Sequence, residues 1–270
     1  MSRLSMNEMT TLRWTFEEDV AHYAAAGFTA IGAWREKVVD CGEQKAAVLL
    51  TEHGLQLSNL LWCGGFTGTD GRTFAESVED AREAIELAAR LQSPCVVVYT
   101  GSRGIHTHNH SRRLVVGALK ELAVAAADAG VDLALEPMNQ GCAAEWTFLT
   151  SLDDALAVLD QVDHPRVKLA FDTYHLGFEH DLLERIEELG KRIAIVHVGD
   201  GREPPSREQN RCLLGDGVLP LGELISALVN SGYDGPFDIE LMGEDVEPVA
   251  YEELLSRSRH ALETLLPTHA

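Results

Sequence analysis

Four residues that can bind a metal ion or transfer a proton follow four apolar segments of this sequence. They are Glu136, Asp172, His197 and Glu240, and the segments before them are residues 131–135, 167–171, 193–196 and 236–239. Short apolar segments of this kind are typical of buried strands in a parallel sheet. The side chains that follow such strands are delivered to the carboxyl edge of the sheet, where the active sites of α/β proteins lie.

Successive members of this set are separated by between 25 and 43 residues, which leaves room for a helix and its two loops. The four side chains are therefore predicted to stand on four consecutive parallel strands and to converge on one point. Three carboxylates and one imidazole form a hard to borderline ligand set. Such a set suits Mn²⁺, Mg²⁺ or Co²⁺ better than an ion that prefers sulfur.

A cation held in this way gives the site a defined chemistry. It can bind adjacent hydroxyl and carbonyl oxygens of a sugar, acidify the intervening C–H bond and stabilise the enediolate that forms. Return of the proton to the neighbouring carbon is aldose–ketose isomerisation, and its return to the opposite face is epimerisation. Loss of a β-hydroxyl group instead is dehydration, so the residues alone leave three reactions open.

The remaining sequence alternates between predicted helices and strands that would position these groups. The predicted helices are 15–26, 36–52, 73–91, 114–129, 151–162, 181–189, 219–231 and 249–265, and the predicted strands are 28–33, 55–61, 94–99, 131–135, 167–171, 193–196 and 237–241. Residues 11–14 are the candidate for a first strand. Eight such units match a single (β/α)₈ TIM barrel over residues 1–270. A doubly wound open sheet is the alternative, but the first βα turn lacks a nucleotide fingerprint.

Several loops carry further candidate residues. The glycine-rich loop 63–71 lacks the spacing and the Lys-Ser/Thr pair of a P-loop. In the loop with alternating histidines we expect a substrate contact, and His106 is our candidate. Among the aromatic residues near strand ends, Trp62 is our candidate for packing against a sugar ring. The polar segment 199–217 is long enough to form a functional lid.

The composition restricts the location and the partners of the chain. It has 22 basic and 43 acidic residues and a net charge of −21, which disfavours nucleic acid and anionic membranes as partners. The sequence has no apolar run near the roughly 20 residues of a membrane helix and no secretory signal, so we expect a cytoplasmic protein. Its five cysteines form no C-x-x-C pair and are expected to be reduced.

The motifs E-P at 136–137, F-D-T-Y-H at 171–175, H-V-G-D at 197–200 and D-I-E at 238–240 resemble those of the xylose-isomerase-like sugar phosphate isomerase/epimerase family. The resemblance implies a TIM barrel with a divalent ion, most often Mn²⁺, with Mg²⁺, Co²⁺ or Zn²⁺ as alternatives. It implies that Glu136, Asp172, His197 and Glu240 bind the ion. By the same resemblance, Glu136 and Glu240 exchange the proton, whereas His175 and an arginine after His197, for which we choose Arg202, contact the substrate.

The resemblance leaves the substrate and the reaction open. We expect an isomerase or epimerase of a keto-sugar, a sugar phosphate or an inosose, and the alternative is a lyase or dehydratase of an inosose or oxidised sugar. The ketose 3-epimerase branch carries a further Glu shortly after its first ligand strand, whereas residues 140–143 here contain no acid. An apurinic-site endonuclease and a metal-free binding module are further alternatives, and the charge of −21 disfavours the first. Members of the family often form dimers or tetramers, which makes a homodimer or homotetramer our expectation.

Overall fold

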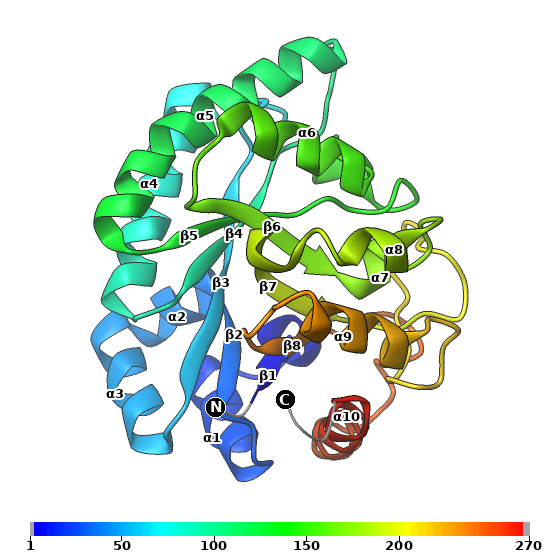
Figure 1. Cartoon of the computed structure of the whole chain (residues 1–270). Helices are drawn as coiled ribbons and strands as arrows, with labels where there is room; N and C mark the ends of the chain where they lie inside the picture. Colours follow the sequence, from blue (N-terminus) through cyan, green and yellow to red (C-terminus); the bar gives the residue numbers. More distant parts are fainter. Residues whose placement is uncertain (1–2, 267–270) are drawn as a thin grey trace.

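The computed structural model describes residues 3–266, and within them eight parallel strands close into a barrel in the order of the sequence (Figure 1). The strands are β1 (Leu4–Asn7), β2 (Ala30–Trp34), β3 (Gln56–Gly64), β4 (Cys95–Tyr99), β5 (Asp132–Leu135), β6 (Val167–Asp172), β7 (Ile193–Val198) and β8 (Phe237–Ile239). The predicted TIM-barrel fold is confirmed.

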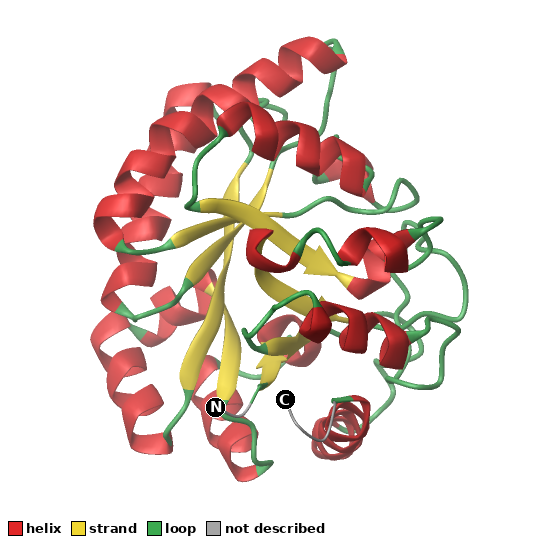
Figure 2. Cartoon of the chain, viewed as in Figure 1, coloured by secondary structure: helices red, strands yellow, loops and turns green. Residues whose placement is uncertain are grey.

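Helices surround the strands, as Figure 2 shows. They are α1 (Phe16–Ala25), α2 (Arg35–Cys41), α3 (Glu43–His53), α4 (Phe74–Arg90), α5 (His108–Ala129), α6 (Leu152–Val162), α7 (Thr173–Leu176), α8 (Leu182–Ile186), α9 (Leu221–Asn230) and α10 (Tyr251–Leu265), with short 3₁₀ turns η1 (Glu8–Thr11), η2 (Ala143–Glu145) and η3 (Gly190–Arg192). Helices α1 and α4 begin with complete capping boxes, in which Thr15 and Thr73 pair with the glutamates three residues later. These caps satisfy the free N–H groups at the helix starts.

Strand register brings buried polar and ionisable residues to one level of the barrel. Asp172 pairs with His197 across β6 and β7, and His197 pairs with Asp238 across β7 and β8. Asp238 in turn pairs with Ser5 across β8 and β1. Because register partners in a parallel sheet point to the same face, these side chains form one belt across four strands.

The interior of the barrel has an apolar part and a polar part. On β3 to β7 the interior cluster consists of Leu61, Cys95, Val97, Ala134, Ala170 and Ile195. On β1, β3 and β8 the buried residues include Ser5, Asn7, Ser58, Asn59 and Asp238. A TIM-barrel interior is usually filled by branched apolar side chains, so a buried polar cluster of this size is unusual.

The prediction of the first strand was wrong. The strand β1 occupies Leu4–Asn7, whereas Thr11 lies in the 3₁₀ turn η1 and Leu12 to Trp14 follow it without strand structure. The physical reason is that Ser5 and Asn7 point into the polar part of the interior, where they bond to Asp238. The strand therefore lacks the continuous apolar run by which the other strands were recognised.

Two predicted helices also differ from the structure. The helix predicted over 36–52 is two helices, α2 and α3, because Gly42 adopts a φ of 89° between them. The helix predicted from residue 114 begins at His108, where the Thr107 hydroxyl accepts from the N–H of His110. His108 and His110 consequently lie in the first turn of α5 rather than in a loop.

The structure also bears on the predictions about membrane helices and cysteines. In the described part of the chain, none of the helices combines the length and apolar character needed to cross a bilayer. All five cysteines have free thiols, and Cys41 is half-buried whereas the other four are buried. The free thiols agree with the expectation that the cysteines are reduced.

Candidate metal centre and active site

Glu136, Asp172 and His197 meet at the carboxyl end of the barrel. Glu136 directly follows β5, Asp172 ends β6 and His197 lies near the end of β7. Each offers one ligand atom, and these atoms all lie within 4.8 Å of one another. All three residues are buried, and their donor types fit a divalent cation. The predicted convergence of these three side chains is therefore present.

His197 contacts two glutamates through one ring nitrogen. Its Nδ1 is 3.2 Å from Oε1 of Glu136 and 3.4 Å from Oε2 of Glu240. Burial disfavours the charged imidazolium, but the hydrogen bond to Glu136 and the charges of Glu240 and Glu136 outweigh it and raise the pKa of His197 to about 10. Without a cation the imidazolium itself therefore balances the carboxylates.

Glu240, the fourth predicted ligand, contacts the same imidazole but also a buried arginine. Its Oε1 lies 3.2 Å from Nη2 of Arg211, and the same Nη2 lies 3.0 Å from Oδ2 of Asp172. Glu240 does not belong to the group of three residues whose ligand atoms all lie within 4.8 Å of one another. Burial raises the pKa of Glu240 to about 7, although Arg211 and His197 oppose the shift. A carboxyl group with this pKa can both accept and donate a proton near neutral pH.

The arginine inside the site is Arg211 and not our candidate Arg202. The Arg211 side chain is 0% exposed and its guanidinium stacks 4.4 Å from the ring centre of Tyr174. The Arg202 side chain is 59% exposed and forms an ion pair with Asp245 at the edge of the mouth. Arg202 lines a surface cavity of about 350 Å³ together with Tyr174. The sequence contained a signal for Arg211, since Cys212, Leu213 and Leu214 follow it as an apolar run that indicates burial.

Asp200 folds the long loop 199–217 so that Arg211 enters the barrel mouth. Its carboxylate accepts from the backbone N–H groups of Gly215, Gly217 and Leu219. The N–H of Arg211 donates to the carbonyl of Met242, directly after the Glu240 segment. The loop that we expected to be a lid is thus anchored at both sides of Arg211, and Figure 1 shows it at the end of the barrel toward which the β6 and β7 arrows point.

His175 lies beside the ligand Asp172. Oδ1 of Asp172 caps α7 by accepting from the N–H groups of Tyr174 and His175, which leaves Oδ2 directed at Arg211 and the imidazole of His175. Nδ1 of His175 is 3.5 Å from the thiol of Cys142. Burial lowers the pKa of His175, an effect that the charge of Asp172 only partly offsets. A neutral imidazole at this position can donate or accept a hydrogen bond to a substrate oxygen.

An aromatic wall borders the same mouth. Trp62 packs on the apolar part of the barrel interior together with Met9, and its ring centre is 5.8 Å from that of Trp146. Tyr99 contacts Trp146 edge to face. His106 lies farther out, where its Nε2 is 3.3 Å from the carbonyl oxygen of Thr67 in the glycine-rich loop. Trp62 therefore borders the predicted site, whereas His106 links two loops of its rim.

Arg72 fixes the glycine-rich loop 63–71. Its guanidinium donates to the carbonyl of Gly64, to Asp70, to Asp80 and to the hydroxyl of Tyr99. This set of bonds ties the loop to the start of α4 and to the end of β4. These hydrogen bonds hold the loop at the rim of the barrel mouth.

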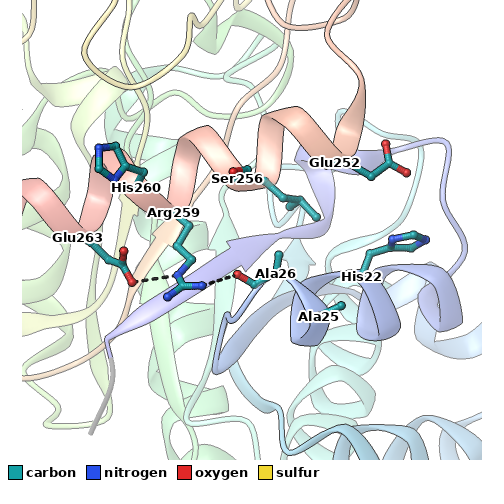
Figure 3. A pocket seen from close by; sticks show the side chains of 9 residues that line it. His22, Ala25, Ala26, Glu252, Ser256, Arg259, His260 and Glu263 are labelled. Atoms are coloured by element: carbon teal, nitrogen blue, oxygen red, sulfur yellow. Dashed lines mark hydrogen bonds and ion pairs between the residues drawn. The ribbon is translucent and has the colours of Figure 1, made fainter.

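A separate cavity of about 410 Å³ lies between α1 and α10 (Figure 3). The residues that line it are His22, Ala25, Ala26, Glu252, Leu255, Ser256, Arg259, His260 and Glu263. Arg259 donates to Glu263 and to the carbonyl of Ala26, so its guanidinium is engaged within the cavity wall. In the described residues the only group whose ligand atoms converge within 4.8 Å is that of Glu136, Asp172 and His197, so this cavity is not the metal-site candidate.

Comparison with known proteins places this geometry in a family. The model of the xylose isomerase-like TIM barrel matches residues 20–264. The chain belongs to that family. Within the xylose isomerase-like family, the chain is 29% identical over 185 residues to an L-ribulose 3-epimerase of Methylomonas sp., covering 67% of this chain and 61% of the relative. It is 24% identical over 212 residues to an inosose isomerase of Halalkalibacterium halodurans, covering 76% and 73%.

A solved structure shows the same architecture. A crystal structure of a protein from Sinorhizobium meliloti superposes with a TM-score of 0.90 at 27% identity and covers 98% of both chains. The alignment with the Methylomonas epimerase spans about three fifths of that relative.

Proposed function

We propose that this chain is a divalent-metal-dependent isomerase or epimerase of a keto-sugar, a sugar phosphate or an inosose. The observation that carries the proposal is the pair of glutamates that both contact Nδ1 of His197, with Asp172 within the same ligand cluster. Relatives that epimerise L-ribulose or isomerise an inosose support a reaction of this class.

Glu136, Asp172 and His197 would hold the cation, with Glu240 as a fourth ligand when Arg211 releases it. Mn²⁺ is the ion we favour, because carboxylate-rich sites with one imidazole suit it, and Mg²⁺, Co²⁺ and Zn²⁺ also fit the ligand types. A bound divalent cation supplies positive charge beside two substrate oxygens and thereby acidifies the C–H bond between them.

Glu240 and Glu136 would transfer the proton. Glu240 has a pKa of about 7, so it is partly ionised at neutral pH and can remove a proton from carbon and return one. Glu136 contacts the same nitrogen of His197, Nδ1, as Glu240 does. Two carboxyl groups beside one substrate can remove a proton from one carbon and return it to a different carbon or to a different face.

Arg211, His175 and Trp62 would orient the substrate. Arg211 presents a buried positive charge between Asp172 and Glu240, where an oxyanion develops in an enolisation. Neutral His175 offers a hydrogen bond, and the face of Trp62 suits the apolar side of a sugar ring. We assign the arginine role to Arg211 because Arg202 points to solvent and pairs with Asp245.

The test is solvent-deuterium exchange into a panel of ketoses and inososes, with Mn²⁺ added and carbon-bound deuterium followed by NMR. We expect exchange without loss of water, and a fall of about 10²- to 10⁴-fold in both Glu136→Gln and Glu240→Gln. The matched control is Glu145→Gln, an exposed acid in η2, which should exchange at the wild-type rate. Wild-type exchange in Glu240→Gln would remove that residue from proton transfer, and an enone product would favour the lyase reaction.

We also propose a small carbohydrate, and not nucleic acid, as the partner. The net charge of −21 repels a polyanion, and the buried arginine at the site, Arg211, is already paired with two carboxylates. Cleavage of a duplex with an abasic site by the purified protein would contradict this part of the proposal.

A further inference from the structure

A buried carboxylate lies directly behind the metal-site histidine. Asp238 is 0% exposed and lies in β8, two residues before Glu240, which directly follows that strand. Residues two apart along an extended chain point to the same face, so both side chains point into the barrel. Its Oδ1 accepts from the hydroxyl of Ser5 at 2.6 Å. Its Oδ2 accepts from Nδ2 of Asn7 at 2.8 Å and from Nδ2 of Asn59 at 2.8 Å. Three hydrogen bonds from two other strands therefore fix the position of this carboxylate.

The backbone of β2 leaves space for this arrangement. A Cβ atom on Gly32 would lie 2.1 Å from Oδ2 of Asp238 and 3.0 Å from Nδ2 of Asn59. Gly32 is itself the register partner of Asn7 and of Asn59. A residue with a side chain at position 32 would displace the carboxylate, so the absence of a side chain there is part of how Asp238 is held.

The imidazole of His197 connects this cluster to the metal site. Nδ1 faces Glu136 and Glu240, whereas Nε2 faces Asp238, whose Oδ2 is 3.9 Å away. Among the described residues Nε2 is a buried nitrogen without a hydrogen-bond partner. A buried polar atom without a partner is costly, and the carboxylate 3.9 Å from it is one that three donors already hold in place.

We propose that Asp238 is a positioning residue of the metal centre, which keeps the Nε2 proton of His197 on the side away from the cation and leaves Nδ1 free to bind it. A ligating histidine commonly directs its second ring nitrogen to a carboxylate, and this fixes both tautomer and ring orientation. The carboxylate of Asp238 is held by Ser5, Asn7 and Asn59. The imidazole of His197 therefore orients toward a fixed acceptor. The inference rests on the proposed metal dependence, and it concerns how Asp238 orients the ring of His197.

The first experiment reads the wild-type protein, and one variant serves only to assign its signal. The protein is labelled with ¹⁵N-histidine, loaded with Zn²⁺, and its histidine tautomers are read from long-range ¹H–¹⁵N spectra, with His197→Gln used to assign the signal. We expect a proton on Nε2 of His197 and none on Nδ1. A proton on Nδ1 with zinc bound at Nε2 would overturn the proposal.

The second experiment measures Zn²⁺ affinity by calorimetry. Asp238→Asn keeps an acceptor oxygen toward Asn7 and Asn59 but loses the charge, and we expect affinity to fall about 10-fold. Asp238→Ala should lose up to about 100-fold. The matched control is Asp19→Asn, another buried aspartate that contacts Lys37 and Thr11, for which we expect lower thermal stability but wild-type zinc affinity.

The outcomes separate this inference from the proposed function. Wild-type zinc affinity in both Asp238 variants would overturn the positioning role and leave the metal site standing. Absence of zinc binding by the wild-type protein would overturn both proposals. If the Asp238 variants do not fold, the tautomer of wild-type His197 still decides the question.

Discussion

Divalent cations should bind this protein in competition with one proton, which is the proton on His197. The pKa of His197 is about 10 because Glu136 and Glu240 outweigh the effect of burial. A cation that binds Nδ1 must displace the proton. At pH 7 this costs about 4 kcal/mol, since His197 lies roughly three units below its pKa and each unit corresponds to about 1.4 kcal/mol.

The sign of the pH dependence follows directly. Because binding releases a proton, affinity rises with pH, by about 10-fold per unit between about pH 7 and the pKa of His197. Below about pH 7 protonation of Glu240 makes the dependence steeper if Glu240 is a ligand. Calorimetric titrations with Zn²⁺ in two buffers of different ionisation enthalpy would count the released protons, and we expect about one near pH 8.

A control variant separates His197 from other histidines of the mouth. His106→Gln should release the same number of protons, since His106 is bonded to the carbonyl of Thr67 on the rim. Equal zinc affinity at about pH 7 and about pH 9, with no proton release, would refute the assignment of Nδ1 of His197 as a ligand.

Three further changes test the packing around the site. Arg211→Met should lower the free energy of unfolding by about 3 kcal/mol, because two buried carboxylates lose their partner. The exposed Arg202 is the control, and Arg202→Met should lower it by less than about 1 kcal/mol. Equal losses of the two variants in urea unfolding would contradict the claim that the buried ion pairs of Arg211 stabilise the fold. Gly32→Ala should lower the melting temperature through its clash with Asp238, whereas Gly117→Ala, which meets nothing within 4 Å in α5, should be neutral or stabilising. Burial, followed by the hydrogen bond and the charge of Asp19, raises the pKa of Glu8, so wild-type stability should fall as pH rises above about 4.5, and Glu8→Gln should remove that slope. If the free energies of unfolding of wild type and Glu8→Gln differ by the same amount at every pH, Glu8 is not the source of the pH dependence.

The sequence predicted the barrel because most of its strands and helices carry strong local signals. Segments such as Cys95–Tyr99 are continuously apolar, and Thr15 and Thr73 head complete capping boxes. The ligand cluster of Glu136, Asp172 and His197 was predictable for the same reason. Each lies at or next to the carboxyl end of a buried strand, and parallel strands in a barrel expose these ends at one mouth.

The choice of arginine could not be made from spacing alone. Arg202, Arg207 and Arg211 all follow His197 within one polar loop, and their order says nothing about which side chain turns inward. The loop conformation depends on the carboxylate of Asp200 bonding to N–H groups 15 to 19 residues later. Such long-range bonds have no local sequence pattern, although the apolar residues after Arg211 favoured its burial.

The misplaced first strand and the further inference have one physical cause. The periodicity used to find strands assumes that inward positions are apolar, and Ser5 and Asn7 are polar because they face Asp238 instead of a hydrophobic core. A polar inward face on a buried strand is stable only when its groups are bonded, and these residues bond to one carboxylate. That carboxylate faces His197 at 3.9 Å. The departure from the expected pattern in β1 therefore lies beside the metal site, where polar groups have a chemical use that compensates for the apolar packing they replace.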